Sequence, residues 1–299
     1  METMETMFRS IGLALLLFVV LVTSTLAQQT GDNANNKPHE DLDALVWLQT
    51  SAEYEAIARQ TFRLARMNMG DALVDPTWSA STEQLSLFAE KPAELAALPP
   101  AIIVDVDETV LDNSSYQCDL IRNETEYSAD SWKTFVNEEV SQPIPGAVEF
   151  VNACRSAGVT VLFVTNREHE IEAATRRNLI ATGLMKETDP DVVFTKYEQE
   201  EWTSDKATRR AHLASKYRIL LLMGDDFNDF VTIKKKPTSQ ERKDAAIEYA
   251  AWWGRKWMML PNPNYGGWER SAYDWNDAAP RSAKLKLKRA RMERDVSDQ

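Results

Sequence analysis

The stretch AIIVDVDET, residues 101–109, decides the fold of this chain of 299 residues. Its first four residues form an uninterrupted apolar run, which is typical of a strand buried on both faces of a parallel sheet. Two aspartates, Asp105 and Asp107, follow where this strand is expected to end. Apolar runs of the same kind stand at residues 159–164 and 218–223. We therefore expect at least three buried strands, the first of which leads directly into carboxylates.

Helical segments separate these runs along the chain. We expect helices at 146–157, 171–182 and 205–216, and a further short strand at 192–194. Strands that alternate with helices pair in parallel through right-handed crossovers. The pattern predicts an α/β fold, a Rossmann-like parallel sheet flanked by helices, over residues 99–280.

An N-terminal helical region is expected before the sheet, over residues 41–98. Residues 41–69 carry a helical apolar stripe, and Gly70 together with the following Asp-Pro pair is expected to end it. A second, short helix is expected at 90–98.

Two further segments stand apart from the alternating pattern. Residues 111–145 are too long for a simple connection, and we expect them to form a small cap-like insertion directly after the first strand. Residues 281–299 alternate basic residues with Ala and Leu, which predicts a charged tail in the form of a solvated helix or a frayed terminus.

The N-terminus has the order of a secretory signal. Arg9 precedes an apolar run at 11–21, and small residues follow as far as Ala27. The run is too short for a comfortable membrane span. We expect a signal peptide at 1–27, a polar linker at 28–40 and a secreted or periplasmic protein, with an uncleaved anchor as the alternative.

Composition and charge exclude several classes of protein. With 43% hydrophobic and 27% charged residues, the chain is neither collagen-like nor wholly disordered. Asp and Glu outnumber Lys and Arg by 46 to 34, so a role in coating nucleic acid polymers is disfavoured.

Two cysteines, Cys118 and Cys154, cannot form a Cys-rich zinc site. Export would permit a disulfide between them, and two buried thiols are the alternative.

Polar residues follow each of the three apolar runs. Asp105 and Asp107 come after the first, Thr165 and Asn166 after the second, and Asp225 after the third. The carboxyl ends of parallel strands meet at one edge of the sheet, where ligands bind. Carboxylates that converge there repel one another and need a hard cation with oxygen ligands, a description that Mg²⁺ fits best.

These residue types suit phosphoryl transfer, which depends on in-line positioning and charge stabilisation. Asp105 can attack phosphorus and form an aspartyl-phosphate. Asp107 can protonate the leaving oxygen and then accept a proton from the hydrolytic water. The hydroxyl of Thr165 and the amide of Asn166 can bind phosphate oxygens, and Lys206 adds positive charge near the start of a predicted helix.

At these residues the chain resembles the haloacid dehalogenase (HAD) superfamily of phosphatases. Residues 105–109 match its first motif, Thr165–Asn166 its second, Lys206 its third, and Gly224–Asp225 with Asp229 its fourth.

The string DETVLDNS at 107–114 narrows the resemblance to the exported bacterial acid phosphatases of subfamily IIIB. The most similar group is that of the lipoprotein-type class C acid phosphatases and 5′-nucleotidases. The strings WLQTSAEY at 47–54 and LPNPNYGGWE at 260–269 agree with it.

The resemblance implies a role for each matched residue. Asp105 is expected to be the nucleophile and a magnesium ligand, and Asp107 the acid/base, which also binds magnesium through its backbone carbonyl. Asp225 is expected to bind the metal with Asp229 nearby, and Lys206 to stabilise the phosphoaspartate. The lipid-anchor cysteine of the group is absent here, so no stable membrane anchor is expected after signal cleavage.

The family's substrates are small phosphomonoesters, often nucleoside 5′-monophosphates held by aromatic stacking. Trp132, Tyr265 and Trp268 are our candidates for the stacking surface, with ordinary core packing as the alternative. We expect an exported, Mg²⁺-dependent acid phosphatase whose oligomeric state is open. A dehalogenase is disfavoured because it would not need Asp107. The other alternative is a non-catalytic binding or storage protein, which would be expected to lose the nucleophile, whereas Asp105 is present.

Overall fold

The structure is a computed structural model that describes residues 39–292. The predicted signal peptide, most of the predicted linker and the end of the predicted tail lie outside these residues. The chain divides into two compact units, Met1–Leu42 and Asp43–Gln299, and the fold and site below belong to the second. No helix within the described range is long and apolar enough to cross a membrane.

A parallel sheet of five strands forms the centre of the second unit. The strands lie in the order β5-β4-β1-β6-β7, and all neighbours run parallel. Their bounds are β1 (Pro100–Val104), β4 (Thr160–Glu168), β5 (Val193–Lys196), β6 (Arg218–Gly224) and β7 (Trp257–Met259). Every residue of β6, and all of β1 after Pro100, is buried, as strands covered on both faces require. The predicted α/β fold is confirmed.

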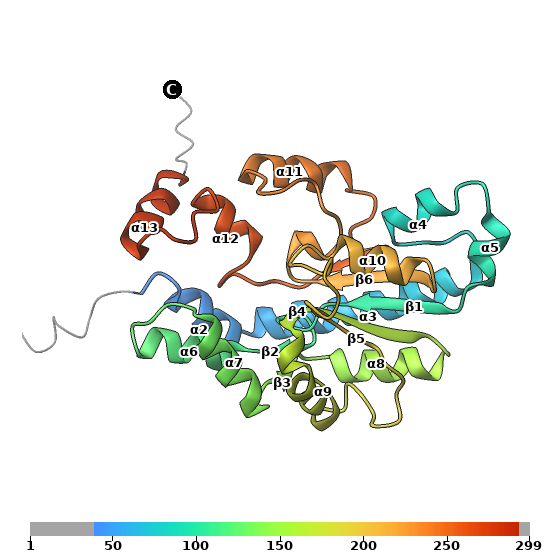
Figure 1. Ribbon diagram of the computed structural model, residues 1–299, viewed down its shortest axis with the longest axis horizontal. Helices are drawn as coiled ribbons and strands as arrows, with labels where there is room; N and C mark the ends of the chain where they lie inside the picture. Colours follow the sequence, from blue (N-terminus) through green and yellow to red (C-terminus); the bar gives the residue numbers. More distant parts are fainter. Residues whose placement is uncertain (1–38, 293–299) are drawn as a thin grey trace, which may run out of the picture. The chain divides into compact units, whose positions relative to one another are not determined.

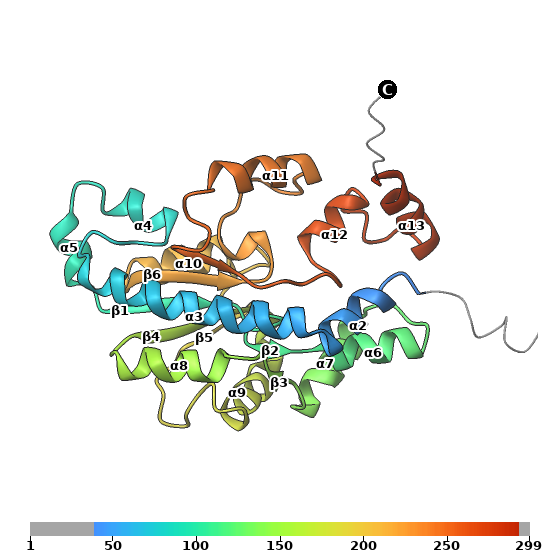
Figure 2. The same ribbon diagram turned by 180° about the vertical axis from the view of Figure 1, so that it is seen from behind.

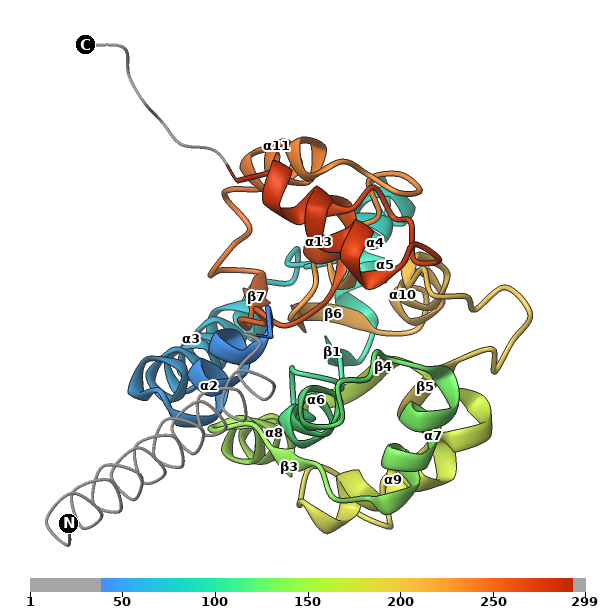
Figure 3. The ribbon, with the colours of Figure 1, turned by 90° about the vertical axis from the view of Figure 1, so that its left-hand side faces the viewer.

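Helices cover both faces of the sheet. On one face, α3 (Ala52–Val74) packs against α8 (Ala147–Ser156), and α9 (Glu172–Ala181) packs on β4 and β5. The other face carries α10 (Ala207–Ala214), which packs against α4 (Thr82–Leu87). Figures 1 and 2 show the two sides, and Figure 3 looks along the strands from their carboxyl ends.

Two helices replace the single one expected at 41–69. They are α2 (Leu42–Thr50) and α3, and Ser51 separates them. The Ser51 side chain accepts a backbone N–H from the first turn of α3 and so caps that helix.

Gly70 does not end α3, contrary to expectation, because the helix continues to Val74. A glycine inside a helix costs only about 1 kcal/mol. Buried Met69 and Ala72 hold the same stretch of helix in the core, so packing overrides the weak local signal. The second helix expected in this region is α5 (Pro92–Ala97), and α4 precedes it.

The insertion after the first strand begins and ends on a small hairpin. It comprises β2 (Leu111–Asp112), α6 (Ser114–Arg122), α7 (Ala129–Glu138) and β3 (Gln142–Pro143). Because β2 pairs with β3 in antiparallel fashion, the insertion leaves β1 and returns beside its own starting point. In Figure 3, α6 and α7 lie at the carboxyl ends of the strands.

The C-terminal part adds α11 (Ser239–Glu248), α12 (Gly267–Ala272) and α13 (Arg281–Ala290). None of the residues of α13 is buried, which fits the solvated helix expected for the tail.

Both cysteines are free thiols, and burial raises the pKa of Cys154 to about 12.

Candidate active site

Three aspartates converge at the carboxyl ends of the two central strands. Asp105 directly follows β1, Asp225 directly follows β6, and Asp229 ends the 3₁₀ turn η2 (Phe227–Asp229). One carboxylate oxygen from each lies within 4.8 Å of the other two. We call these three residues the carboxylate group. The structure thus brings together all three predicted residues, from segments more than a hundred positions apart in the sequence.

The turn after β6 is built to place Asp229 close to the strand. A Cβ atom at Gly224 would overlap the Asp229 side chain, so only glycine leaves room there. The Asp226 N–H donates to Asp229 Oδ2 at 3.0 Å, and the Asp226 carboxylate accepts the Asn228 N–H at 2.9 Å. These reciprocal bonds form a capping box that fixes the direction of the Asp229 side chain.

Lys206 connects two members of the carboxylate group. Its Nζ donates to Asp105 Oδ1, and to Asp229 Oδ1 at 2.6 Å. The lysine is 4% exposed, at the residue that precedes α10. Burial lowers the pKa of Lys206, but the charges of Asp105 and Asp229 outweigh burial and raise it overall. The ammonium group is therefore a fixed positive charge beside the first carboxylate of the site.

One ammonium does not balance three carboxylates, of which Asp105 and Asp229 are buried and Asp225 is half-buried. Burial raises the pKa of Asp105 to about 7, against the opposing charge of Lys206. Burial, followed by the charges of Asp229 and Asp105, holds the pKa of Asp225 well above its usual range. The excess negative charge and the oxygen-only donors fit a hard divalent cation, and within residues 39–292 no cysteine or histidine belongs to this group.

Asp107 lies beside the carboxylate group but is held by other partners. Its Oδ1 accepts hydrogen bonds from Arg167 Nε at 2.9 Å and from Asn113 Nδ2 at 2.9 Å. Its Oδ2 accepts a longer bond, of 3.3 Å, from the Thr165 hydroxyl. Arg167 and Asn113 were not among the predicted site residues. The available signal was that Arg167 directly follows Thr165–Asn166, and that Asn113 lies in the string 107–114.

The strand that carries Thr165 and Asn166 runs further than expected. The apolar run ends at Val164, but β4 continues to Glu168. Side chains alternate along a strand, so buried Thr165 and Arg167 share one face and exposed Asn166 lies on the other. The Asn166 amide donates to the Ser204 carbonyl at 3.1 Å and accepts from Arg209 at 2.6 Å.

A hydrogen-bonded pair, buried Glu108 and half-buried Tyr265, links the loop after β1 to the loop after β7. Glu108 has a φ of 55°, in the left-handed region, and its carboxylate accepts the backbone N–H of Asn113 at 3.0 Å. The Tyr265 hydroxyl donates to the same carboxylate. Burial, followed by the charge of Asp107, raises the pKa of Glu108 to about 8. Tyr265 is thus anchored by its hydroxyl next to the residue that follows Asp107.

The three predicted aromatic residues have different surroundings. Trp132 packs against Tyr116 and Phe135 in the insertion, with the Arg167 guanidinium 5.6 Å from the centre of its ring. Trp268 is 44% exposed, and its Nε1 donates to the Tyr265 carbonyl at 3.0 Å. Trp132 therefore contacts Arg167, which bonds Asp107. Tyr265 bonds Glu108, the residue that follows Asp107, and Trp268 bonds the backbone of Tyr265.

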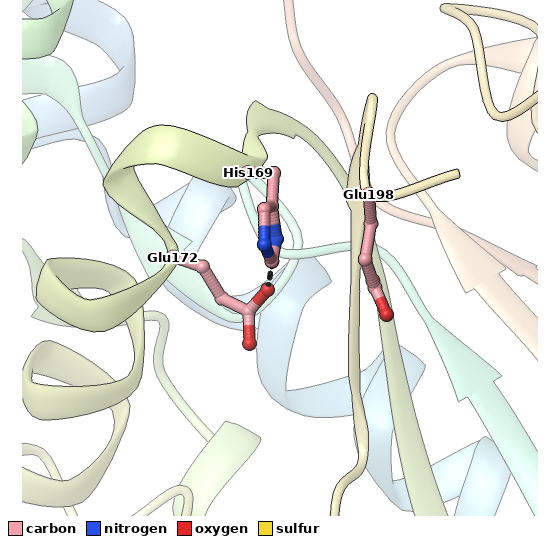
Figure 4. A group of neighbouring side chains, drawn as sticks. All are labelled: His169, Glu172 and Glu198. Carbon is pink, nitrogen blue, oxygen red and sulfur yellow. Dashed lines mark hydrogen bonds and ion pairs between the residues drawn. The ribbon is translucent and has the colours of Figure 1, made fainter. Parts of the chain in front are cut away.

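A second group with the spacing of a metal site lies near the end of β4. His169, Glu172 and Glu198 offer donor atoms within 4.8 Å of one another, and we call them the histidine group. Figure 4 shows the His169 ring bonded to Glu172, with Glu198 opposite. The His169 Nδ1 to Glu172 distance is 2.8 Å, and Arg176 Nε donates to the other Glu172 oxygen at 2.6 Å. His169 is therefore not part of the carboxylate group.

Comparisons with known proteins agree with this geometry. A family model described as HAD superfamily, subfamily IIIB (Acid phosphatase) matches residues 43–268. The class C acid phosphatase from Bacillus anthracis superposes with a TM-score of 0.72 at 25% sequence identity, covering 85% of this chain and 97% of that one. A second structure of that protein, with tungstate bound, has a TM-score of 0.71, the same identity and the same coverage.

Proposed function

The chain belongs to subfamily IIIB of the HAD superfamily and is an acid phosphatase, and from this premise we propose that it is an exported, Mg²⁺-dependent enzyme that hydrolyses small phosphomonoesters through an aspartyl-phosphate. The observation that carries the proposal is the pair Asp105 and Lys206. A carboxylate at the centre of the sheet edge is held by a buried ammonium, with two further carboxylates beside it. This arrangement supplies a carboxylate nucleophile. The ammonium beside it, and a cation held by the carboxylates, would offset the negative charge of the phosphoryl group.

The carboxylate group and the backbone carbonyl of Asp107 are the residues that would hold Mg²⁺. When bound, the cation supplies positive charge that screens the carboxylates and the phosphoryl oxygens. The three carboxylate side chains already converge, and the pKa of Asp225 is raised first by burial and then by the charges of Asp229 and Asp105, which such a cation would balance.

The chain's own residues divide the reaction into two displacements. In the first, a carboxylate oxygen of Asp105 bonds to phosphorus, the bond to the leaving oxygen breaks, and Asp107 gives that oxygen a proton. In the second, a water oxygen bonds to phosphorus, its proton passes to Asp107, and the bond between Asp105 and phosphorus breaks to release phosphate. Lys206 stays next to Asp105 through both steps and offsets the charge on the phosphoryl group.

Thr165 and Asn166 would bind phosphate oxygens in this proposal. The Asn166 side chain lies on the other face of β4, bonded to Ser204 and Arg209, so its amide would have to turn away from these partners to reach a phosphate that Thr165 binds. The Thr165 hydroxyl lies next to Asp107 and can turn its proton towards a phosphate oxygen.

The substrate class rests on the aromatic residues around Asp107. Trp132 from the insertion and the Tyr265–Trp268 loop after β7 are available to hold a nucleobase, and stacking on such rings is worth ~1–3 kcal/mol per base in single-strand binding. We propose nucleoside 5′-monophosphates as the preferred substrates on this basis.

A panel of phosphomonoesters at acid pH tests the proposal. The protein should hydrolyse them with added Mg²⁺, lose activity with a chelator and regain it when Mg²⁺ is returned. An Asp105→Asn preparation run in parallel controls for a contaminating phosphatase. Full activity after exhaustive chelation and dialysis would contradict the metal requirement, and no hydrolysis of any ester would contradict the catalytic proposal.

Export rests on the N-terminal pattern alone, and it has its own test. The N-terminus of the protein recovered from its native host should begin near Gln28. A recovered chain that still carries residues 1–27 would contradict cleavage.

A further inference from the structure

The two oxygens of the Asp107 carboxylate have unequal surroundings. Oδ1 accepts two hydrogen bonds, from Arg167 Nε at 2.9 Å and Asn113 Nδ2 at 2.9 Å, and Arg167 Nη2 lies at ion-pair distance, 2.9 Å, from the same oxygen. Oδ2 receives one, the Thr165 hydroxyl at 3.3 Å. A carboxylate oxygen has about two lone-pair sites, so Oδ1 is saturated while Oδ2 keeps capacity for a proton.

The donors on Oδ1 are themselves fixed. Arg167 is 1% exposed, and its Nη2 also donates to Asn113 Oδ1 at 3.2 Å. The same Asn113 oxygen accepts the Ser141 hydroxyl at 2.6 Å, and the Asn113 backbone N–H is bonded to Glu108. Each donor to Asp107 is therefore tied to at least one further buried residue, which leaves the carboxylate little freedom to rotate.

This arrangement joins the insertion to the sheet. Asn113 and Ser141 belong to the insertion, and Arg167 belongs to β4. The insertion also covers the guanidinium with the ring of Trp132, 5.6 Å away. A buried guanidinium without good partners would be costly, and the matched carboxylate, amide and ring explain why this one is tolerated.

We propose that Arg167 and Asn113 are positioning residues that hold Asp107 by its Oδ1, so that Oδ2 is the atom that exchanges the catalytic proton. This inference rests on the proposed function. In the first displacement the Oδ2 proton passes to the leaving oxygen as the bond between that oxygen and phosphorus breaks, and the carboxylate that forms keeps both hydrogen bonds on Oδ1. In the second, a proton from water returns to Oδ2. Lys206 and the carboxylate group take no part in this role.

The leaving group separates this role from a merely structural one. An alkoxide leaving group needs a proton as its bond breaks, whereas p-nitrophenolate is stable enough to leave with little help. Misplacing Oδ2 should therefore reduce kcat/KM for an alkyl phosphate, such as glycerol phosphate, far more than for p-nitrophenyl phosphate. General acid catalysis contributes roughly 10²–10⁴-fold, which sets the size of the expected difference.

The experiment measures kcat/KM for both esters in wild type, Arg167→Met, Arg167→Lys and Asn113→Ala. We expect Arg167→Met to lose about 10²-fold more on the alkyl ester than on the aryl ester, within the range of general acid catalysis. Arg167→Lys should restore part of the alkyl activity, because it keeps the charge without the planar fork. Asn113→Ala removes one donor and should change the ratio in the same direction by a smaller factor.

Arg218→Met is the matched control. Arg218 is also a buried arginine, but its guanidinium bonds backbone carbonyls at the end of α3 and does not contact Asp107. This variant should lower stability and leave the ratio of the two esters unchanged. Circular dichroism checks that each variant is folded. If Arg167→Met does not fold, the comparison of the two esters in Asn113→Ala tests the proposal.

The outcomes are distinguishable. Equal losses on both esters in Arg167→Met and Asn113→Ala would overturn the positioning role while leaving the acid phosphatase intact. Wild-type protein that hydrolyses neither ester, or an Asp105→Asn variant that keeps its activity, would instead contradict the proposed function itself.

Discussion

The carboxylate group and the histidine group have the same spacing and opposite surroundings. In each, three donor atoms lie within 4.8 Å of one another. The side chains of Asp105 and Asp229 are each 8% exposed, whereas that of His169 is 56% exposed. The first group lies at the ends of β1 and β6, and the second lies near the end of β4 (Figure 4).

The difference shows that spacing alone does not identify a metal site. In the histidine group the acceptors already have N–H partners: Glu172 bonds His169 and Arg176, and Glu198 accepts the Thr195 backbone N–H at 3.1 Å. In the carboxylate group, buried Asp105 and Asp229 share one ammonium, and half-buried Asp225 accepts a hydrogen bond from the neutral Asn262 amide at 2.8 Å. Burial makes that deficit of positive charge expensive, and this is why the carboxylate group, of the two, is the one expected to need a cation.

Removing the nucleophile should have the largest effect. Asp105→Asn keeps the shape of the side chain but cannot form the aspartyl-phosphate, so kcat should fall by roughly 10⁴-fold or more. The fold should be retained, because Lys206 keeps Asp229 as a partner. Steady-state assays and circular dichroism check this, and activity within about tenfold of wild type would rule out the covalent mechanism.

A matched pair of variants compares the two donor groups directly. Asp225→Asn should reduce activity at a fixed Mg²⁺ concentration by about 10²-fold and raise the Mg²⁺ concentration needed for half-maximal rate. Even changes to the residues that support metal ligands commonly lower metal affinity or activity by roughly 10–100-fold. Glu198→Gln removes the same charge from the histidine group and should leave the Mg²⁺ titration unchanged. A shift of equal size in both variants would abolish the distinction drawn between the groups.

Trp132→Ala should have an intermediate effect that depends on the substrate. AMP and ribose 5-phosphate share a leaving oxygen and differ in the base, so their comparison isolates stacking from proton transfer. The loss of kcat/KM should be roughly five- to 150-fold greater for AMP, which corresponds to ~1–3 kcal/mol of stacking. If both substrates lose the same factor, Trp132 does not contact the base.

The smallest effects concern two glycines with opposite surroundings. Gly224→Ala should destabilise the protein by about 1–3 kcal/mol, because its Cβ overlaps the Asp229 side chain. Gly70→Ala, with nothing within 4 Å of its Cβ, should stabilise α3 by about 0.5–1 kcal/mol. Thermal or urea unfolding measures both. A neutral Gly224→Ala would mean that the turn after β6 moves freely, which contradicts a rigid carboxylate group.

The sheet and the convergence of the aspartates could be predicted from the sequence because both depend on strong local patterns. Continuous apolar runs identify strands buried on both faces, and parallel strands place their carboxyl ends at one edge whatever the details of packing. Asp105 and Asp225 directly follow such runs, so their meeting needed no knowledge of side-chain contacts.

The partners of Asp107 could not be predicted in the same way. They depend on the true end of β4 at Glu168, where polar residues extend the strand by backbone pairing that the apolar pattern does not reveal. Only that extension places Arg167 on the same face as Thr165. Likewise Gly70 signals a helix end locally, and only the packing of α3 shows that the helix continues.

The stereochemistry at phosphorus tests the central claim most directly. The proposed reaction is two in-line displacements, first by Asp105 and then by water, and each inverts the configuration at phosphorus. The substrate carries a phosphoryl group made chiral by oxygen isotopes, and an acceptor alcohol replaces water so that the product phosphate ester is still chiral. The configuration at phosphorus should be retained overall. Overall inversion would mean a single direct displacement and would contradict the role of Asp105 as a covalent nucleophile.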